Sequence, residues 1–69
     1  MSIFATRLKQ LREDRELSQR AFGKAIGFGS NTIFQWESDM RTPDINSLLK
    51  ICNFFDVSAD YLIGRTNVE

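Results

Sequence analysis

Four neighbouring residues have the spacing of one outer face of a short helix: Ser30, Asn31, Phe34 and Gln35. Ile33 falls between them and Trp36 follows them, and both would point into the protein. Three of the four outer side chains donate and accept hydrogen bonds, and the fourth is aromatic. The pattern therefore predicts a surface that meets a partner.

The chain lacks the residue types from which most catalytic and metal centres are built. It has no histidine and one cysteine, and no pair of carboxylates falls in an evident cleft. It therefore offers no acid, base or nucleophile in a workable arrangement, and too few ligands for a zinc site. It also has no glycine-rich loop of the kind that holds phosphates. We predict a protein that is not an enzyme, uses no metal or cofactor and has no evident small-molecule ligand.

The first of two helices that position the outer face is predicted over 19–26. Ser18 is a good N-cap for it. Spacings of three and four residues place three apolar side chains on one face: Phe22, Ala25 and Ile26.

Two glycines predict how the second helix, over 30–38, meets the first. Gly27 can take the left-handed conformation that ends a helix, so the chain can turn at once. Gly23 has no side chain to hold the two helices apart, although glycine costs about 1 kcal/mol inside a helix. The pattern is that of a helix-turn-helix. On these residues alone, any small helical bundle remains an alternative.

The 69 residues fit one domain, 1–69, which buries about 60% of its unfolded surface and has no room for a deep cavity. No alternating strand pattern occurs, so we expect an all-helical protein. Pro43 follows Thr42, and the two are predicted as N1 and N-cap of the fourth helix. The expected helices are 2–14, 19–26, 30–38, 44–55 and 58–63.

Two further expectations concern Cys52 and location. Cys52 would lie with Leu48, Ile51 and Phe55 on the inner side of the fourth helix, as a small apolar residue. The sequence shows no leader and no long apolar run, so we expect a cytoplasmic protein with no membrane partner.

The chain as a whole resembles the DNA-binding domain of the phage repressor and Cro family, also called the Xre family. Besides the helix pair, three segments carry the resemblance: ATRLKQLREDRELSQ (5–19), WESDMRTPD (36–44) and SLLKICNFFDVSADYLIGRTN (47–67). They are similar to the family's first helix, to the loop after its recognition helix and to its last two helices. The resemblance implies an all-α, lambda repressor-like fold, a compact bundle of about five short helices whose recognition helix is 30–38.

The resemblance also implies that the outer face of 30–38 contacts base edges in the major groove, through Ser30, Asn31, Phe34 and Gln35. Asn and Gln can each form two hydrogen bonds with adenine, which gives about 1–3 kcal/mol of discrimination against a wrong base. Phe34 could contact thymine methyl groups or a protein partner, and the sequence leaves both open.

Contacts to DNA phosphates are implied for residues around the two helices: Gln19, Arg20, Ser38 and Arg41. At the start of 19–26, the Gln19 side chain and nearby backbone amides would meet a phosphate near the positive end of the helix dipole. The formal net charge is zero, but residues 1–27 hold six basic and three acidic side chains. Part of the surface is therefore expected to attract phosphate. An ordinary solvated face is the alternative explanation for three of these cations, each taken singly: Arg7, Lys9 and Lys24.

Arg12 and Glu37 match an arginine and a glutamate that pair in members of the family. We expect a structural ion pair that fixes the angle between helices. The alternative is an exposed Arg12 that contacts phosphate. Glu16 departs from the family, because glycine commonly ends the first helix there, and we expect a different helix end or some strain.

The function that the resemblance implies is a sequence-specific, double-stranded DNA-binding transcriptional regulator, a repressor of the phage or prophage kind. The recognition face has no lysine or arginine, and Asp39 and Asp44 lie close to the expected DNA backbone. We therefore expect modest affinity and a homodimer on a pseudo-palindromic operator. Dimer contacts would lie near the fifth helix, although several of the residues could be core: Phe54, Val57, Ala59 and Tyr61. The rival hypothesis is a protein-interaction module on the same fold, such as an antitoxin or antirepressor.

Overall fold

The computed structural model describes residues 2–69, and every regular element in that range is an α-helix. The helices are α1 (Ile3–Asp14), α2 (Gln19–Ile26), α3 (Ser30–Glu37), α4 (Ile45–Phe55) and α5 (Ala59–Leu62). The five predicted helices are confirmed, with each boundary within one residue of the expected one. None of these helices is long and apolar enough to cross a membrane.

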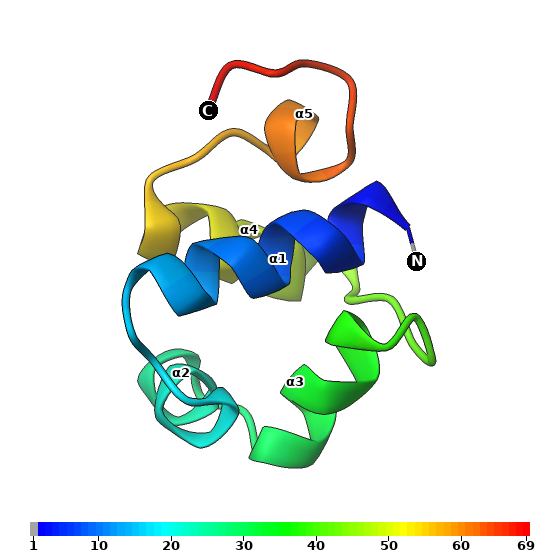
Figure 1. The fold of residues 1–69 in the computed structure, drawn as a ribbon. Coiled ribbons are helices and arrows are strands. Elements are labelled where there is room, and N and C mark those ends of the chain that lie inside the picture. Colours follow the sequence, from blue (N-terminus) through cyan, green and yellow to red (C-terminus); the bar gives the residue numbers. More distant parts are fainter. Residues whose placement is uncertain (1) are drawn as a thin grey trace.

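Figure 1 shows α1 crossing the middle of the molecule in front of α4, with α2 and α3 below and α5 above. α2 and α3 pack on each other, α1 packs on α3 and α5, and α4 packs on α2 and α5. The Phe22 ring lies 5.0 Å from the Phe55 ring and 5.5 Å from the Phe54 ring, between centroids. This aromatic cluster joins the helix-turn-helix to α4.

The turn between α2 and α3 has the predicted geometry. Gly27 has a φ of 88°, in the left-handed region, and its N–H donates to the Gly23 carbonyl. A Cβ added at Gly23 would lie 2.6 Å from the Phe28 carbonyl oxygen and 3.1 Å from Ile33 Cγ1. The close approach predicted for Gly23 is therefore confirmed.

Ala25 does not lie on the buried face of α2, where its spacing had placed it. The buried residues of the helix are Phe22, Gly23 and Ile26, and Ala25 is exposed. At 100° per residue, Gly23 and Ala25 lie on opposite sides of Phe22. Because Gly23 is in contact with the turn, the buried face is centred away from Ala25.

The predicted cap of α4 is wrong. Asp44, not Thr42, is the N-cap, and its Oδ1 accepts from the Ser47 N–H over 2.8 Å. Pro43 therefore precedes the cap instead of occupying the first helical position. A carboxylate caps at least as well as a threonine hydroxyl, and a residue before proline favours extended backbone, which holds Thr42 outside the helix.

Two further expectations are confirmed. Cys52 is 6% exposed and belongs to the core, and burial raises the pKa of its thiol, which keeps it protonated near neutral pH. Glu16 has a φ of 56°, so the chain leaves α1 through a left-handed residue that is not glycine.

Candidate nucleic-acid interface

The outer face of α3 is left open by the way the helix packs. Ile33, Trp36 and Glu37 are its buried residues, and they hold one side of α3 against the rest of the molecule. Four side chains remain on the other side: Ser30 and Asn31, which are exposed, Phe34, which is 48% exposed, and Gln35, which is half-buried. The helix thus presents short polar groups and one aromatic ring together.

The Arg12–Glu37 pair lies beneath this face. Arg12 Nε and Nη2 donate to the two carboxylate oxygens of Glu37 over 2.7 and 3.0 Å, and Nη1 donates to the Leu17 carbonyl over 2.7 Å. Arg12 is 9% exposed and Glu37 is 4% exposed. The hydrogen bond to Glu37 raises the pKa of the Arg12 guanidinium. The pair connects α1 to the end of α3, and the alternative of an exposed Arg12 is wrong.

Gln19 takes part in the same network, which the sequence did not indicate. Its Nε2 donates to Glu37 Oε1 over 3.1 Å, and the side chain is half-buried. The phosphate contact expected of Gln19 would therefore be made by the second N–H of its side-chain amide or by its backbone N–H. Gln19 and Glu37 are 18 positions apart and lie on different helices, so no local pattern predicts this contact.

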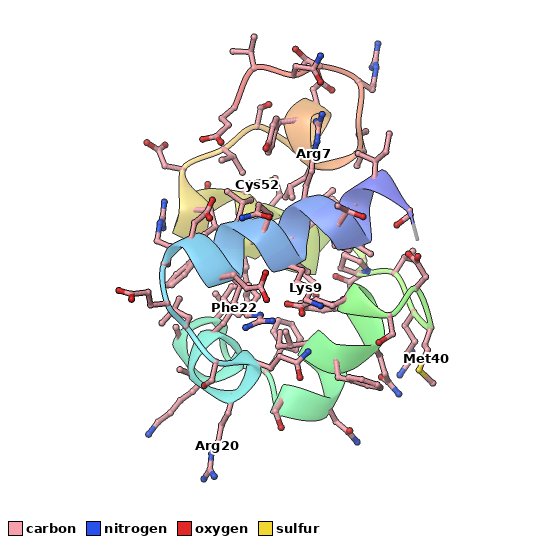
Figure 2. All side chains as sticks on the ribbon, in the orientation of Figure 1. Arg7, Lys9, Arg20, Phe22, Met40 and Cys52 are labelled. Carbon is pink, nitrogen blue, oxygen red and sulfur yellow. The ribbon has the colours of Figure 1, made fainter. Side chains whose placement is uncertain are left out.

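The other three residues assigned to phosphates are exposed: Arg20, Ser38 and Arg41. Figure 2 shows Arg20 pointing away from α2 into open space. After α3 the chain folds back, and the N–H groups of Met40 and Arg41 donate to the Gln35 carbonyl over 2.9 and 3.3 Å. This turn keeps Arg41 beside the end of α3, where it lines a cleft of about 240 Å³ together with Thr32 and Trp36.

Two cations of the N-terminal half donate hydrogen bonds within the protein. Arg7 donates to the Tyr61 carbonyl, to the Thr66 carbonyl over 2.6 Å and to Asn67 Oδ1 over 2.8 Å. Its guanidinium also lies 4.2 Å from the Tyr61 ring centroid, and Figure 2 shows it pointing toward α5. Arg15 donates to the carbonyls of Phe54 and Phe55 at the end of α4. Within residues 2–69, the side chains of Lys9, Arg20, Lys24 and Arg41 have no ion pair or hydrogen bond.

Two carboxylates add negative charge near the end of α3 and the start of α4. Asp39 accepts from the Ser2 hydroxyl over 2.5 Å and from the Ser2 N–H over 2.6 Å, and these bonds lower the pKa of Asp39. Hydrogen bonds from Ser47 lower the pKa of Asp44. Both side chains are therefore ionised at neutral pH.

The residues expected to form a dimer near the fifth helix contribute mainly to the core. Val57 is 8% exposed, and the other three are partly buried and pack against the core: Phe54, Ala59 and Tyr61. From α4 to the end of the chain, the large apolar side chains that are exposed are Ile45, Leu49, Ile63 and Val68. A dimer through the four expected residues alone would therefore have little free apolar surface.

Comparisons with known proteins agree with this geometry. The helix-turn-helix family model matches residues 8–62. The HTH-type transcriptional regulator ImmR of Bacillus subtilis is 37% identical over 63 residues, which cover 91% of this chain and 50% of that protein. The cryptic phage CTXphi transcriptional repressor RstR of Vibrio cholerae is 28% identical over 69 residues, 97% of this chain and 62% of that protein. The chain thus spans about half to three fifths of the length of these relatives.

A solved structure is similar over nearly the whole chain. It is the crystal structure of the P22 c2 repressor protein in complex with synthetic operator 9T in the presence of Tl⁺. The TM-score is 0.84 at 28% sequence identity, and the match covers 91% of this chain and 96% of that one.

Proposed function

We propose, because this chain belongs to the helix-turn-helix family, that it binds double-stranded DNA in a sequence-specific way and regulates transcription as a repressor of the phage or prophage kind. The observation that carries the proposal is the outer face of α3. It presents polar side chains outward on a fold that is similar, at a TM-score of 0.84, to a repressor in complex with an operator.

In this proposal α3 lies in the major groove and its outer side chains contact base edges. Asn31 and Gln35 stand one turn apart and are the candidates for two-bonded contacts with adenine, while the Ser30 hydroxyl adds a shorter contact. Phe34 packs on thymine methyl groups. Its exposure of 48% supports this use, because about half of the side chain is free to meet a partner.

Phosphate contacts would hold the helix in register. Three exposed residues are the candidates for these contacts: Arg20 on α2, and Ser38 and Arg41 after α3. The first amides of α2, at Gln19 and Arg20, add the positive end of the helix dipole. Such contacts fix orientation and carry no direct sequence information.

We infer that the protein binds a pseudo-palindromic operator as a homodimer, because the charge of its surface favours only weak binding by one copy. We expect this binding to take place in the cytoplasm. Asp39 and Asp44 are ionised near the phosphate candidates, and Arg7 and Arg15 are bonded within the protein. Each half-site should therefore bind weakly. Two linked half-sites raise the effective concentration and restore useful affinity.

The experiment that tests the proposal is selection of bound sequences from a random duplex pool at low salt. The same selection is carried out with the Asn31→Ala, Gln35→Ala double variant for comparison. Both changes lie on the open face and should leave the fold intact. The proposal predicts an enriched inverted repeat that the double variant does not select. Affinity for that repeat should also fall steeply with added salt.

A protein-interaction module on the same fold is the second candidate, and the exposed Phe34 ring favours it. A hydrophobic partner site would bind with little dependence on salt. A pool that yields no enriched sequence at any salt concentration would refute DNA recognition and favour this candidate, with Phe34→Ala as the first variant to test against a protein partner.

A further inference from the structure

We infer that Gln19 is a positioning residue that sets the angle of α3 on DNA, an inference that rests on the proposed function. Gln19 is the first residue of α2, and Glu37 is the last residue of α3. Gln19 Nε2 donates to Glu37 Oε1 over 3.1 Å, and Arg12 Nη2 donates to the same oxygen over 3.0 Å. The bond from Gln19 therefore ties the start of one helix to the end of the other.

The start of α3 is already fixed by a different contact. The Phe28 N–H donates to the Gly23 carbonyl over 2.7 Å, and the Phe28 carbonyl lies so close to Gly23 that no side chain fits between them. Glycine at this position lets the turn before α3 pack directly on α2. The start of α3 thus acts as a pivot, and the bonds to Glu37 hold the other end of the helix, together with the packing of Ile33 and Trp36.

The two base-contacting amides lie at different distances from that pivot. α3 has eight residues, about 12 Å of helix, so a displacement of about 1 Å at Glu37 turns the helix by about 5°. Gln35 is two residues from Glu37, whereas Asn31 is the second residue of the helix. Loosening the end of α3 therefore displaces Gln35 most, and hydrogen bonds to a base edge weaken steeply with such misalignment.

The chemistry of the Gln19 amide suits both tasks. A carboxamide has two N–H donors and one acceptor oxygen, and Glu37 uses one donor. The second N–H stays available to a phosphate at the start of α2. Gln19 can then contact the DNA backbone while it holds the recognition helix, so the protein places α3 relative to the phosphate that it binds.

The test compares the sequence preference of Gln19→Met with that of Arg20→Ala, using the pool selection described above. Met keeps the length of the side chain and removes the amide. Arg20 is the neighbouring exposed cation with no partner in residues 2–69, so its loss should weaken binding to all sequences equally. The base pair that Gln35 contacts is identified as the one at which Gln35→Ala loses preference.

In Gln19→Met, we expect the preference for the correct base to fall about tenfold at the base pair that Gln35 contacts. At the base pair that Asn31 contacts, it should fall less than about twofold. A residue that only contacts phosphate would not produce this unequal loss. Uniform weakening like that of Arg20→Ala, with both preferences intact, would overturn the inference while leaving the proposed function in place.

A second measurement tests the contact in the free protein. Gln19→Glu places a carboxylate against Glu37, so its urea midpoint should fall below that of the wild type at pH 7. Gln19→Met, which removes the donor without adding a charge, should lose less. A Gln19→Glu midpoint equal to that of the wild type would overturn the inference. If the wild type selects no duplex, the proposed function fails and the positioning role fails with it, whereas this measurement still decides whether Gln19 contacts Glu37.

Discussion

Removal of the Glu37 carboxylate should strongly destabilise the helix-turn-helix. Glu37→Ala deletes both carboxylate oxygens that Arg12 binds and leaves a guanidinium at 9% exposure with one remaining partner, the Leu17 carbonyl. Breaking a buried pair in this way costs about 3–5 kcal/mol, because a buried charge is left uncompensated.

That cost is large compared with the stability of so small a domain. At about 0.05–0.15 kcal/mol per residue, a chain of 69 residues has about 3–10 kcal/mol of unfolding free energy. Urea denaturation followed by far-ultraviolet circular dichroism should therefore show Glu37→Ala with a greatly lowered midpoint, or already unfolded without urea. Glu13→Ala is the control. Glu13 is exposed on α1, and its side chain forms no hydrogen bond or ion pair in residues 2–69, so its loss should cost less than about 0.5 kcal/mol.

The Arg12→Met, Glu37→Met double variant separates charge burial from packing. Because it leaves no unpaired charge, it should be more stable than Glu37→Ala, and it can approach the wild type. Equal losses for Glu37→Ala and Glu13→Ala would refute the reasoning. A double variant less stable than Glu37→Ala would refute it as well, since the damage would then come from lost volume or shape.

Three further outcomes follow from individual contacts. Gly23→Ala should destabilise the protein by about 1 kcal/mol in thermal melts, because the added Cβ would lie 2.6 Å from the Phe28 carbonyl oxygen. Alanine favours helices more than glycine does, so a protein stabilised by this change would contradict the close approach. Hydrogen bonds from Ser2 lower the pKa of Asp39, so its carboxylate stabilises the fold above about pH 4 and that contribution is lost as pH falls through the lowered pKa. Asp39→Asn, which tolerates the left-handed φ of 62°, should therefore have a lower urea midpoint than the wild type at pH 7 and approach it near pH 3, whereas a constant gap would be inconsistent. Arg7→Met should speed amide hydrogen exchange in the segment after α5 without changing α2 or α3, since Arg7 binds the Thr66 carbonyl; unchanged exchange would show that the contact does not hold the segment.

The helices were predictable because their signals are local. Ser18 caps α2 with its own side chain and Gly27 ends the helix through its own φ, so each boundary depends on neighbours in the sequence. The miss at α4 has the same origin. Thr42 and Asp44 are both acceptable caps two residues apart, and local preference alone did not choose between them.

The contacts that shape the candidate site were less accessible to sequence reasoning. The Arg12–Glu37 pair was expected from the family resemblance and not from spacing. The bond from Gln19 to Glu37 spans 18 positions, and the bonds from Arg7 to the segment after α5 span up to 60. Such contacts depend on how helices are placed in space, and exposed cations and structural cations have the same appearance in a sequence.

An NMR titration of the protein with a duplex that carries the selected repeat tests, residue by residue, whether the outer face of α3 is the surface that binds DNA. Backbone amide shifts should change at the start of α2 and along Ser30–Glu37, with little change at Ile45, Leu49 and Ile63. Changes confined to those exposed apolar residues, with α3 unaffected, would show that DNA binds elsewhere on the protein.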